Sequence, residues 1–535
     1  MSRRRKSPPM QLNMGDRFLN LSERGQKAIR NSILGHFGDV VFPRINTDDY
    51  RVLYSSEGRG PAYLQGLIAA TYLFQSTDMS VDDLIMHIET DIAYQYALHT
   101  TSAEKQPFSR RNIFYFLAKL DAYREETGID LIEQTFDGIT ESFAKEMGLD
   151  KASGEKIKRR MDSMMIGSAA SRLPRTGIIY TTNQDAVKLF VGLIGKEYLP
   201  AELHHYLDES DQNAVIYHNK DGQREKIAKL LGESKLILDL MSEEEWHEFR
   251  QYKNLKRCIL DQGTITEDGT VIPKENKEIR GSSLQSPKDP GATARTKNRR
   301  TYVGRVGNFT ETYDEVGNAL ITNADIRENT YSDSEFMSDY IESKEDNAPE
   351  QVITDGAYYS AENAKKAEAK GITIIPTSLT GTETNPICGE FTLSEDGRQV
   401  VTCPNGVVPF EQVYHEDTGV INAKFDHAQC DQCPFKDQCP GKSQKHSVKV
   451  SISEKMVDRA VLQAEMGTEE YKDFGRERNA VESIPSIFRR KFGADHIRSR
   501  INNRVRSTYF AKCLAYNCMK HKRFLDRQRD SYAFA

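Results

Sequence analysis

The order of predicted elements between residues 302 and 378 constrains the fold of this chain more than any other feature. Two alternating segments, "YVGRVGNFTETYD" and "ALITNADIREN", are separated by a turn and predict a β-hairpin. A helical segment, "SDSEFMSDYIESKED", comes next. It is followed by the strand "EQVITDGAYYS", the helix "AENAKKAEAKG" and the strand "ITIIPTS". A strand–helix–strand order is typical of an α/β core.

The first 150 residues have a different pattern, in which apolar residues recur at helix spacing. Ser80 and Ser109 each precede such a segment and are suited to cap the first turn of a helix. Arg110 and Arg111 follow Ser109 directly, so both cations would lie near a helix N-terminus and could contact DNA. A dimerisation or packing domain is the alternative, and the pattern does not separate the two.

Length and charge narrow the class of protein. A chain of 535 residues is too long for one core, so we expect two to four domains. The net charge of −6 excludes a uniformly basic nucleic-acid coat, but "MSRRRK" at the start and the C-terminal region are locally basic. Such regions could bind phosphates, with a solvated, salt-bridged helix surface as the alternative reading.

The N-terminus and the apolar runs bear on localisation. The positive start is not followed by the apolar stretch of a signal peptide, so export is not expected. The longest apolar run, "LQGLIAATYLF", is too short to span a bilayer. We therefore expect an intracellular protein with no membrane partner, in a reducing compartment where eight cysteines would not form a disulfide framework.

Four cysteines form a candidate zinc site. Cys430 and Cys433 are spaced as C-x-x-C, Cys439 follows in the same short loop, and Cys403 can supply a fourth thiolate. Four sulfurs satisfy the tetrahedral geometry of a structural Zn²⁺, which would not itself do chemistry. A redox pair or unrelated buried thiols are the alternatives. Reserve ligands are Cys388, His415, His427 and His446; ordinary buried thiols are expected at Cys258, Cys513 and Cys518.

Three acidic residues form a candidate catalytic site. Asp162 and Asp355 each follow apolar residues of a predicted strand, and Glu482 lies in the basic C-terminal region. Carboxylates that meet at strand ends repel one another, and a divalent cation relieves that repulsion and sets up phosphodiester hydrolysis. In a continuous helix Arg478, Glu482 and Arg489 would share one face, although Pro485 fits only if a helix begins near Ser483 or bends there.

With these residues in place, the chain resembles bacterial insertion-sequence transposases with a DDE catalytic domain, in the subgroup that carries a cysteine-rich segment. The likeness covers most of the chain in order. Its motifs are the helical run from "GPAYLQG", "RMDSMMI", "SPKDPGATARTKNRRTYVGRVGNFTET", "TDGAYYSAEN", "CPNG…CDQCPFKDQC" and "RERNAVES". In the glutamate motif, Gly475 replaces a tyrosine, Arg478 and Glu482 match, and Arg489 replaces a lysine.

The resemblance implies an α/β fold with an RNase H-like mixed sheet, an α-helical N-terminal domain, a helical insertion and a small cysteine-rich zinc insertion. The expected organisation is a helical DNA-binding or dimerisation domain at 1–150, catalytic-domain parts at 155–182 and 301–378, a mainly helical insertion and linker at 183–300, the zinc insertion at 379–450, and the final catalytic helix with basic helices at 451–535.

The resemblance also implies a function. The chain would be a transposase that binds the ends of its insertion sequence and catalyses DNA cleavage and strand transfer. Asp162, Asp355 and Glu482 would bind two Mg²⁺ or Mn²⁺ ions, with structural Zn²⁺ elsewhere. The partners would be terminal inverted repeats and target DNA, bound by a homodimer on paired ends in the prokaryotic cytoplasm at the nucleoid. DNA phosphates would be held by Arg478, Arg489, Arg490, Lys491, Arg110 and Arg111.

Two alternative functions stay open on the sequence. A domesticated transposase could keep the fold as a non-catalytic DNA-binding protein. An RNase H-like nuclease could cleave DNA without strand transfer. Acids at all three motif positions favour the catalytic readings.

Overall fold

The computed structural model divides the chain into two compact units. Unit 1 comprises Met1–Lys151, Ser163–Tyr331 and Ile484–Ala535, and unit 2 comprises Ala152–Asp162 and Ser332–Ser483. The structure describes residues 15–54, 60–61, 63–77, 79–150, 156–208, 210–217, 222–297, 299–345 and 349–533. The basic run "MSRRRK" therefore lies outside the described residues.

The N-terminal region of unit 1 is helical, as predicted. Ser80 and Ser109 cap α4 and α6, and each shares a reciprocal capping box with the residue three positions on, Asp83 or Asn112. The helices are α1 (Glu23–Arg30), α2 (Ile33–His36), α3 (Leu64–Ser76), α4 (Val81–Thr90), α5 (Ile92–Ala97), α6 (Arg110–Thr127) and α7 (Leu131–Met147).

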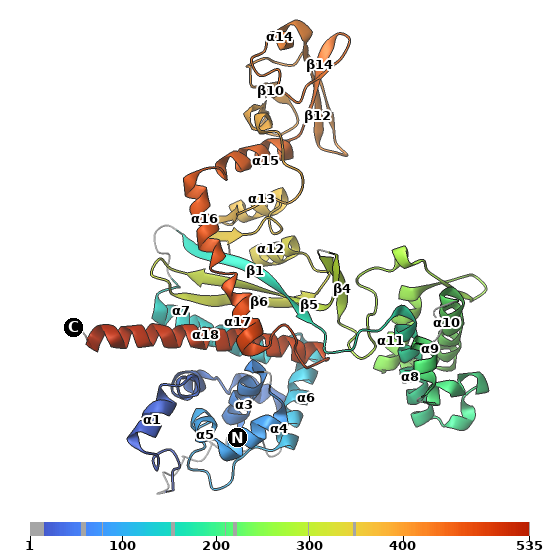
Figure 1. Cartoon of the computed structure of the whole chain (residues 1–535), viewed down its shortest axis with the longest axis vertical. Coiled ribbons are helices and arrows are strands. Elements are labelled where there is room, and N and C mark those ends of the chain that lie inside the picture. Colours follow the sequence, from blue (N-terminus) through green and yellow to red (C-terminus); the bar gives the residue numbers. More distant parts are fainter. Residues whose placement is uncertain are drawn as a thin grey trace, which may run out of the picture. The chain divides into compact units, whose positions relative to one another are not determined.

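The long C-terminal helix α18 (Asn502–Ala533) completes this part of unit 1 (Figure 1). It packs against α3, α7 and the strand β6 (Ala319–Glu328), so the first and last segments of the described chain share one core. Cys513 and Cys518 are buried on it, as expected for ordinary core thiols. None of the described helices combines the length and the apolar character needed to cross a bilayer.

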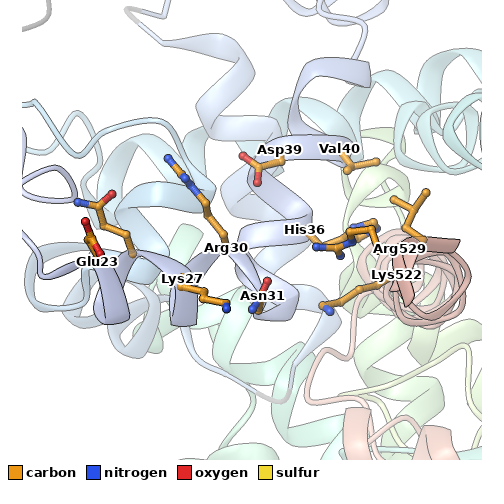
Figure 2. A pocket seen from close by; sticks show the side chains of 11 residues that line it. Glu23, Lys27, Arg30, Asn31, His36, Asp39, Val40, Lys522 and Arg529 are labelled. Atoms are coloured by element: carbon orange, nitrogen blue, oxygen red, sulfur yellow. The ribbon is translucent and has the colours of Figure 1, made fainter. Parts of the chain in front are cut away.

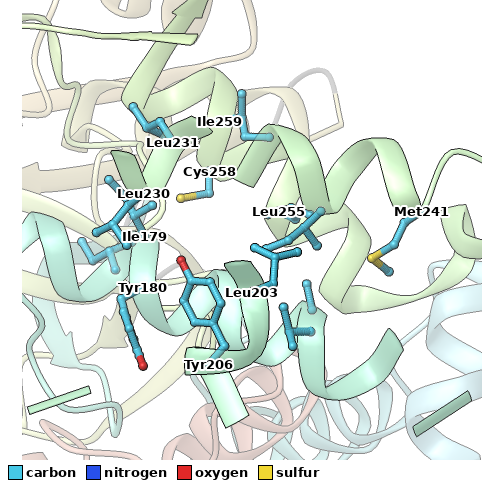
Figure 3. Close-up of a cluster of buried hydrophobic side chains, with 14 of the residues drawn as sticks. Ile179, Tyr180, Leu203, Tyr206, Leu230, Leu231, Met241, Leu255, Cys258 and Ile259 are labelled. Atoms are coloured by element: carbon cyan, nitrogen blue, oxygen red, sulfur yellow. The ribbon is translucent and has the colours of Figure 1, made fainter. Parts of the chain in front are cut away.

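A second core of unit 1 lies among helices of the predicted insertion (Figure 3). Asn183 is fully buried there and donates hydrogen bonds to Tyr206 Oη and to the carbonyl oxygen of Leu230. The helices are α8 (Arg175–Leu193), α9 (Asp211–Tyr217), α10 (Gln223–Leu240) and α11 (Arg250–Gln262). Helix α8 begins before Asn183, the residue at which helical spacing first becomes visible in the sequence. The earlier turns of α8 are buried on nearly every side, so they show no one-sided apolar pattern.

The segment after α11, expected to be a loop or linker, contains three short strands. Gly269, with a φ of 83°, lies in the turn between β2 (Gly263–Ile265) and β3 (Val271–Pro273). The Asp268 carboxylate accepts hydrogen bonds from the backbone N–H and the hydroxyl of Thr270 in this turn. Strand β4 (Thr293–Lys297) then pairs antiparallel with β5 (Arg300–Tyr313), which pairs with β6 (Ala319–Glu328). Polar strand residues at a sheet edge hid these strands from the hydrophobic pattern.

Strand β1 (Ile157–Gly167) contributes to both units. In unit 1 the strand order is β4-β5-β1, with β6 beside β5. In unit 2 the order is β1-β7-β8, with β7 (Glu350–Thr354) and β8 (Ile372–Pro376) parallel to each other and β7 parallel to β1. Parallel and antiparallel pairs make the sheet mixed, which confirms the mixed α/β class, and helices α12 (Asp333–Glu342) and α13 (Ala361–Ala369) lie where predicted.

The cysteine-rich segment of unit 2 is richer in strands than predicted. Its sheet has the order β11-β12-β14-β13, and a separate pair is formed by β9 and β10. Phe425 and Val450 belong to an apolar core of its own. The strands are β9 (Thr392–Leu393), β10 (Val400–Thr402), β11 (Glu411–His415), β12 (Val420–Asp426), β13 (Lys442–Ser443) and β14 (Ser447–Ile452); the helix α14 spans His427–Asp431. Helices α15 (Glu454–Glu465), α16 (Glu469–Asn479) and α17 (Ser483–Phe492) follow.

A buried histidine pair ties the two ends of unit 1 together. His36 Nε2 lies 3.4 Å from His521 Nδ1, and His521 Nε2 lies 2.9 Å from the carboxylate of Glu146. Phe143 stacks on the His521 ring at 4.0 Å between centroids. Because a carboxylate only accepts, the network is satisfied when His521 donates from Nε2 and accepts from His36. Burial, with the nearby charge of Lys522, lowers the pKa of His36 to about 3.

The buried His36 should make unfolding depend on pH. Its folded pKa lies below the ordinary value of 6.5, so its stabilising contribution is present above pH 6.5 and falls as the pH falls. Between pH 6.5 and 5 the free energy of unfolding should fall by about 1.4 kcal/mol per pH unit because of this residue. Urea unfolding at several pH values should show a flatter dependence for His36→Gln and no change for the exposed His446→Gln. An unchanged slope in His36→Gln would contradict this account.

Candidate active site

Asp162 and Asp355 come together through the register of two parallel strands. In unit 2, Arg160 of β1 pairs with Ile353 of β7. Asp162 and Asp355 each lie two residues beyond these partners, so the strands carry them to the same level of the sheet. The predicted meeting of these two acids therefore follows from the observed pairing.

Asp162 was predicted to lie at the end of its strand, and this prediction is wrong. It lies inside β1, which runs on to Gly167, whereas Asp355 directly follows the last residue of β7. Strand β1 is the longer of the two because β5 pairs with it in unit 1. Asp162 is mostly buried, with 15% of its side chain exposed, and Asp355 is more open at 37%.

A tight turn fixes the backbone around Asp355. Asp355 Oδ1 accepts a hydrogen bond from the backbone N–H of Ala357 at 2.8 Å, and the N–H of Gly356 donates to Ser378 Oγ. A Cβ at Gly356 would lie 2.4 Å from the carbonyl oxygen of Ser378. Only glycine fits this approach of the two loops, which explains the "DG" pair in the motif.

Glu482 lies between two helices rather than within one. Helix α16 ends at Asn479 and α17 begins at Ser483, so the expectation of one continuous helix is wrong and the alternative of a new helix near Ser483 is confirmed. Pro485 lies in the first turn of α17, where its missing N–H costs no helical bond. Val481 is fully buried and anchors the turn that presents Glu482.

One guanidinium contacts all three acids. Arg478 Nη1 donates to Glu482 Oε1 at 2.9 Å, while Nη2 lies 3.8 Å from Asp162 Oδ1 and 4.0 Å from Asp355 Oδ2. The Arg478 side chain is only 13% exposed, and its Nε is buried with no hydrogen-bond partner among the described residues. Three carboxylates thus converge on one monovalent cation in a largely buried position.

The convergent acids are not arranged as a finished metal site. Among the described residues, no group of three or more histidine, cysteine or acidic side chains could hold a metal ion as it stands. The guanidinium of Arg478 instead provides the positive charge that the three carboxylates share. Carboxylate oxygens are the ligands that Mg²⁺ prefers, so the donor chemistry fits a divalent cation.

Contacts between β1 and α16 hold Arg478 in place, and sequence reasoning missed them. Arg160 Nη1 donates to the carbonyl oxygen of Glu477 at 2.9 Å, and Lys158 Nζ lies 3.8 Å from the Glu477 carboxylate. These residues precede Arg478 and Asp162 closely in sequence. The basic run "KIKRR" at the start of β1 was the available signal, because cations are unusual in a strand with buried neighbours.

The other predicted DNA contacts lie in unit 1. Arg489, Arg490 and Lys491 are exposed in the last turn of α17. Arg110 stacks on Phe114 and pairs with Asp82 at 3.0 Å, and Arg111 is exposed beside it on α6. The structure therefore leaves these cations at the surface, where phosphate could reach them.

The four predicted zinc ligands line one cavity of about 340 Å³ in the cysteine-rich segment. Burial, together with the neighbouring thiols of Cys439, Cys403 and Cys433, raises the pKa of Cys430 to about 11. All four cysteines are free of disulfides. The four thiols thus line the same cavity, but in the described part of the chain they do not form a group that could hold a metal ion.

Removing the shared guanidinium should destabilise unit 2 and increase the stabilisation of unit 2 by divalent cations. Arg478→Gln should lower the stability of α16 by roughly 1–2 kcal/mol, because the partly exposed carboxylates lose their counter-charge. Hydrogen exchange of α16 with and without Mn²⁺ should show a larger protection by Mn²⁺ in this variant. The matched control is Arg476→Gln on the same helix, whose pair with Asp473 is exposed. Equal Mn²⁺ effects in both variants would argue against the shared role.

Comparison with protein-family models found a match in the C-terminal part of the chain. The family model described as "Transposase DDE domain" matches residues 402–521, a range that contains Arg478, Glu482 and the cysteines from Cys403 to Cys439. Comparison with curated proteins and with solved structures found no match. A DDE transposase domain implies transposase activity, DNA binding and the use of divalent metal ions. Residues 402–521 of this chain are therefore similar to the DDE domain of transposases.

Proposed function

We propose that this protein binds the ends of its own mobile element and catalyses metal-dependent cleavage and strand transfer. The observation that carries the proposal is the convergence of Asp162, Asp355 and Glu482 on the guanidinium of Arg478. These acids are far apart in the chain, and chance surface carboxylates would have no reason to share one buried cation. Two aspartates and one glutamate are the residue types that the resemblance to DDE transposases implies for the catalytic triad.

Asp162, Asp355 and Glu482 would hold the divalent ions. When bound, Mg²⁺ ions would supply Lewis-acid activation of water and stabilise the leaving 3′ oxygen. The three side chains differ in exposure, from 15% for Asp162 to 57% for Glu482. Asp162 would therefore fix the buried side of the site, while Glu482, on its turn between helices, faces the solvent side from which DNA arrives.

Arg478 would serve both the resting site and the DNA complex. Its Nη atoms contact the three acids and offset part of their negative charge, and its buried Nε lacks a partner among the residues described. A scissile-strand phosphate would satisfy a guanidinium released from the acids, since two parallel hydrogen bonds to phosphate suit its planar geometry. Exposed Arg489, Arg490 and Lys491 would add sequence-independent phosphate contacts, and Arg110 and Arg111 would do so on α6.

The RNase H-like arrangement and the homodimer on paired ends belong to the same proposal. They rest on the resemblance of the motif order and on the mixed sheet, in which β1 and β7 carry Asp162 and Asp355 side by side. A labelled fragment of the DNA flanking the coding sequence, incubated with a supercoiled target, separates the alternatives. Joined product supports transposition, cleavage alone a nuclease, and binding alone a non-catalytic protein.

Neutralising any one acid should abolish cleavage without abolishing DNA binding. Asp162→Asn, Asp355→Asn and Glu482→Gln should each lower the cleavage rate at least about 100-fold, the scale expected for losing an electrostatic group of an active site. Gel shifts with the same fragment should show retained complexes. Glu470→Gln, an exposed acid in the first turn of α16, is the matched control and should cleave normally. Wild-type rates in all three variants would refute the assignment.

We also propose that Cys403, Cys430, Cys433 and Cys439 hold a structural Zn²⁺. Their thiols line one cavity, and the apolar core beside them is small, so a closed thiolate site would add stability that this core lacks. The ion would stabilise the β12–β14 module and take no part in the chemistry. Cys388, buried in the same core, is the alternative fourth ligand.

Zinc analysis of the purified full chain tests this assignment. Elemental analysis should find about one zinc per chain, and Cys430→Ser with Cys433→Ser should remove it. Cys518→Ala, which changes a buried thiol on α18, should leave the zinc content unchanged. A wild-type chain without zinc, or a double variant that keeps it, would overturn the assignment.

A further inference from the structure

Unit 1 contains a cavity of about 510 Å³ that the transposase chemistry does not use (Figure 2). Its walls come from α1, from the segment that follows it, and from the C-terminal part of α18. Four cations line it: Lys27, Arg30, Lys522 and Arg529. The two lining carboxylates, Glu23 and Asp39, leave the lining with an excess of positive charge.

The two cations from α1 are available to a ligand. In the part of the chain that the structure describes, the ammonium group of Lys27 has no ion-pair partner. Arg30 stacks over the ring of Phe18 at 5.3 Å, a contact that orients the guanidinium without neutralising it. Figure 2 shows Lys27 and Lys522 pointing toward each other from opposite walls, with Asn31 between them.

The two cations from α18 are held by a weak local pair. Lys522 lies 2.6 Å and Arg529 lies 2.5 Å from Asp526, about one turn away on the same helix. Asp526 is 41% exposed, and ion pairs between residues three or four positions apart on a helix contribute well under 1 kcal/mol. An anion in the cavity could therefore recruit both cations at little cost.

The cavity is preformed rather than assembled by a ligand. His36 lines it and is buried, and its contact with His521 joins the wall near α2 to α18. Phe143 stacks on His521 from the interior. A rigid floor reduces the ordering cost of binding, so opposed cations can act on an anion without first being brought together.

We propose that this cavity binds phosphate groups of the DNA backbone and so forms a second, sequence-independent DNA contact. The inference rests on the proposed function, because DNA is the phosphate polymer that a transposase handles. The chemistry favours a backbone over a free nucleotide: no Phe, Tyr or Trp is among the described residues that line the cavity, so a base has no stacking platform there. Opposed lysines and arginines instead supply the positive charge that attracts backbone phosphates.

Salt-dependent DNA binding by the full chain tests the site. Fluorescence anisotropy with a labelled duplex should show that Lys27→Gln with Lys522→Gln weakens binding about tenfold and lowers the slope of log Kd against log salt by about 2. The loss should be equal for the flanking fragment and an unrelated duplex. Lys253→Gln, an exposed lysine on α11 that pairs with Glu248, is the control and should change neither quantity by more than about half as much.

Each other outcome has a distinct meaning. A wild-type chain that binds DNA while the double variant keeps the same affinity and salt slope overturns the cavity assignment alone. Titration with inorganic pyrophosphate provides the second arm: micromolar binding that the double variant loses, with DNA binding unchanged, assigns the cavity to a free phosphate and overturns the DNA contact. A wild-type chain that binds no DNA overturns the proposed function and this inference with it.

Discussion

The candidate active site of unit 2 depends on one electrostatic interaction, in which the Arg478 guanidinium contacts three carboxylates. Asp162 and Asp355 reach it from parallel strands, and Glu482 reaches it from the turn between α16 and α17. Three negative groups this close would repel one another without the Arg478 guanidinium, whose side chain is only 13% exposed. The geometry of the sheet, the break between the helices and the contacts of β1 with α16 all place charge around this single side chain.

Much of the core could be predicted because local pattern and final structure agree. Apolar spacing in the sequence predicts the hairpin of β5 and β6, the helices α12 and α13, and the strands β7 and β8. Ser80 and Ser109 cap helices as capping chemistry requires. The class of the fold followed from these elements, whereas their assembly into two units follows from long-range packing that no local pattern reports.

The misses have physical reasons. Helix α8 is buried on nearly all sides, so its start showed no amphipathic signal. Strand β4 is short and polar, and its extended conformation depends on its pairing with β5. The break before Ser483 was one of two readings that Pro485 allowed, and only the packing of Val481 selects it. Arg478 was expected to contact DNA, and its contacts with Asp162 and Asp355 depend on the packing of α16 against β1, which no local pattern reports.

Crystals of the full chain soaked with Mn²⁺ would test the central claim most directly, because anomalous scattering locates the ion independently of activity. The account predicts an anomalous peak between the carboxylates of Asp162, Asp355 and Glu482, with the Arg478 side chain moved away from them. An Arg478 guanidinium that still bridges the acids, with Mn²⁺ bound only elsewhere, would contradict it.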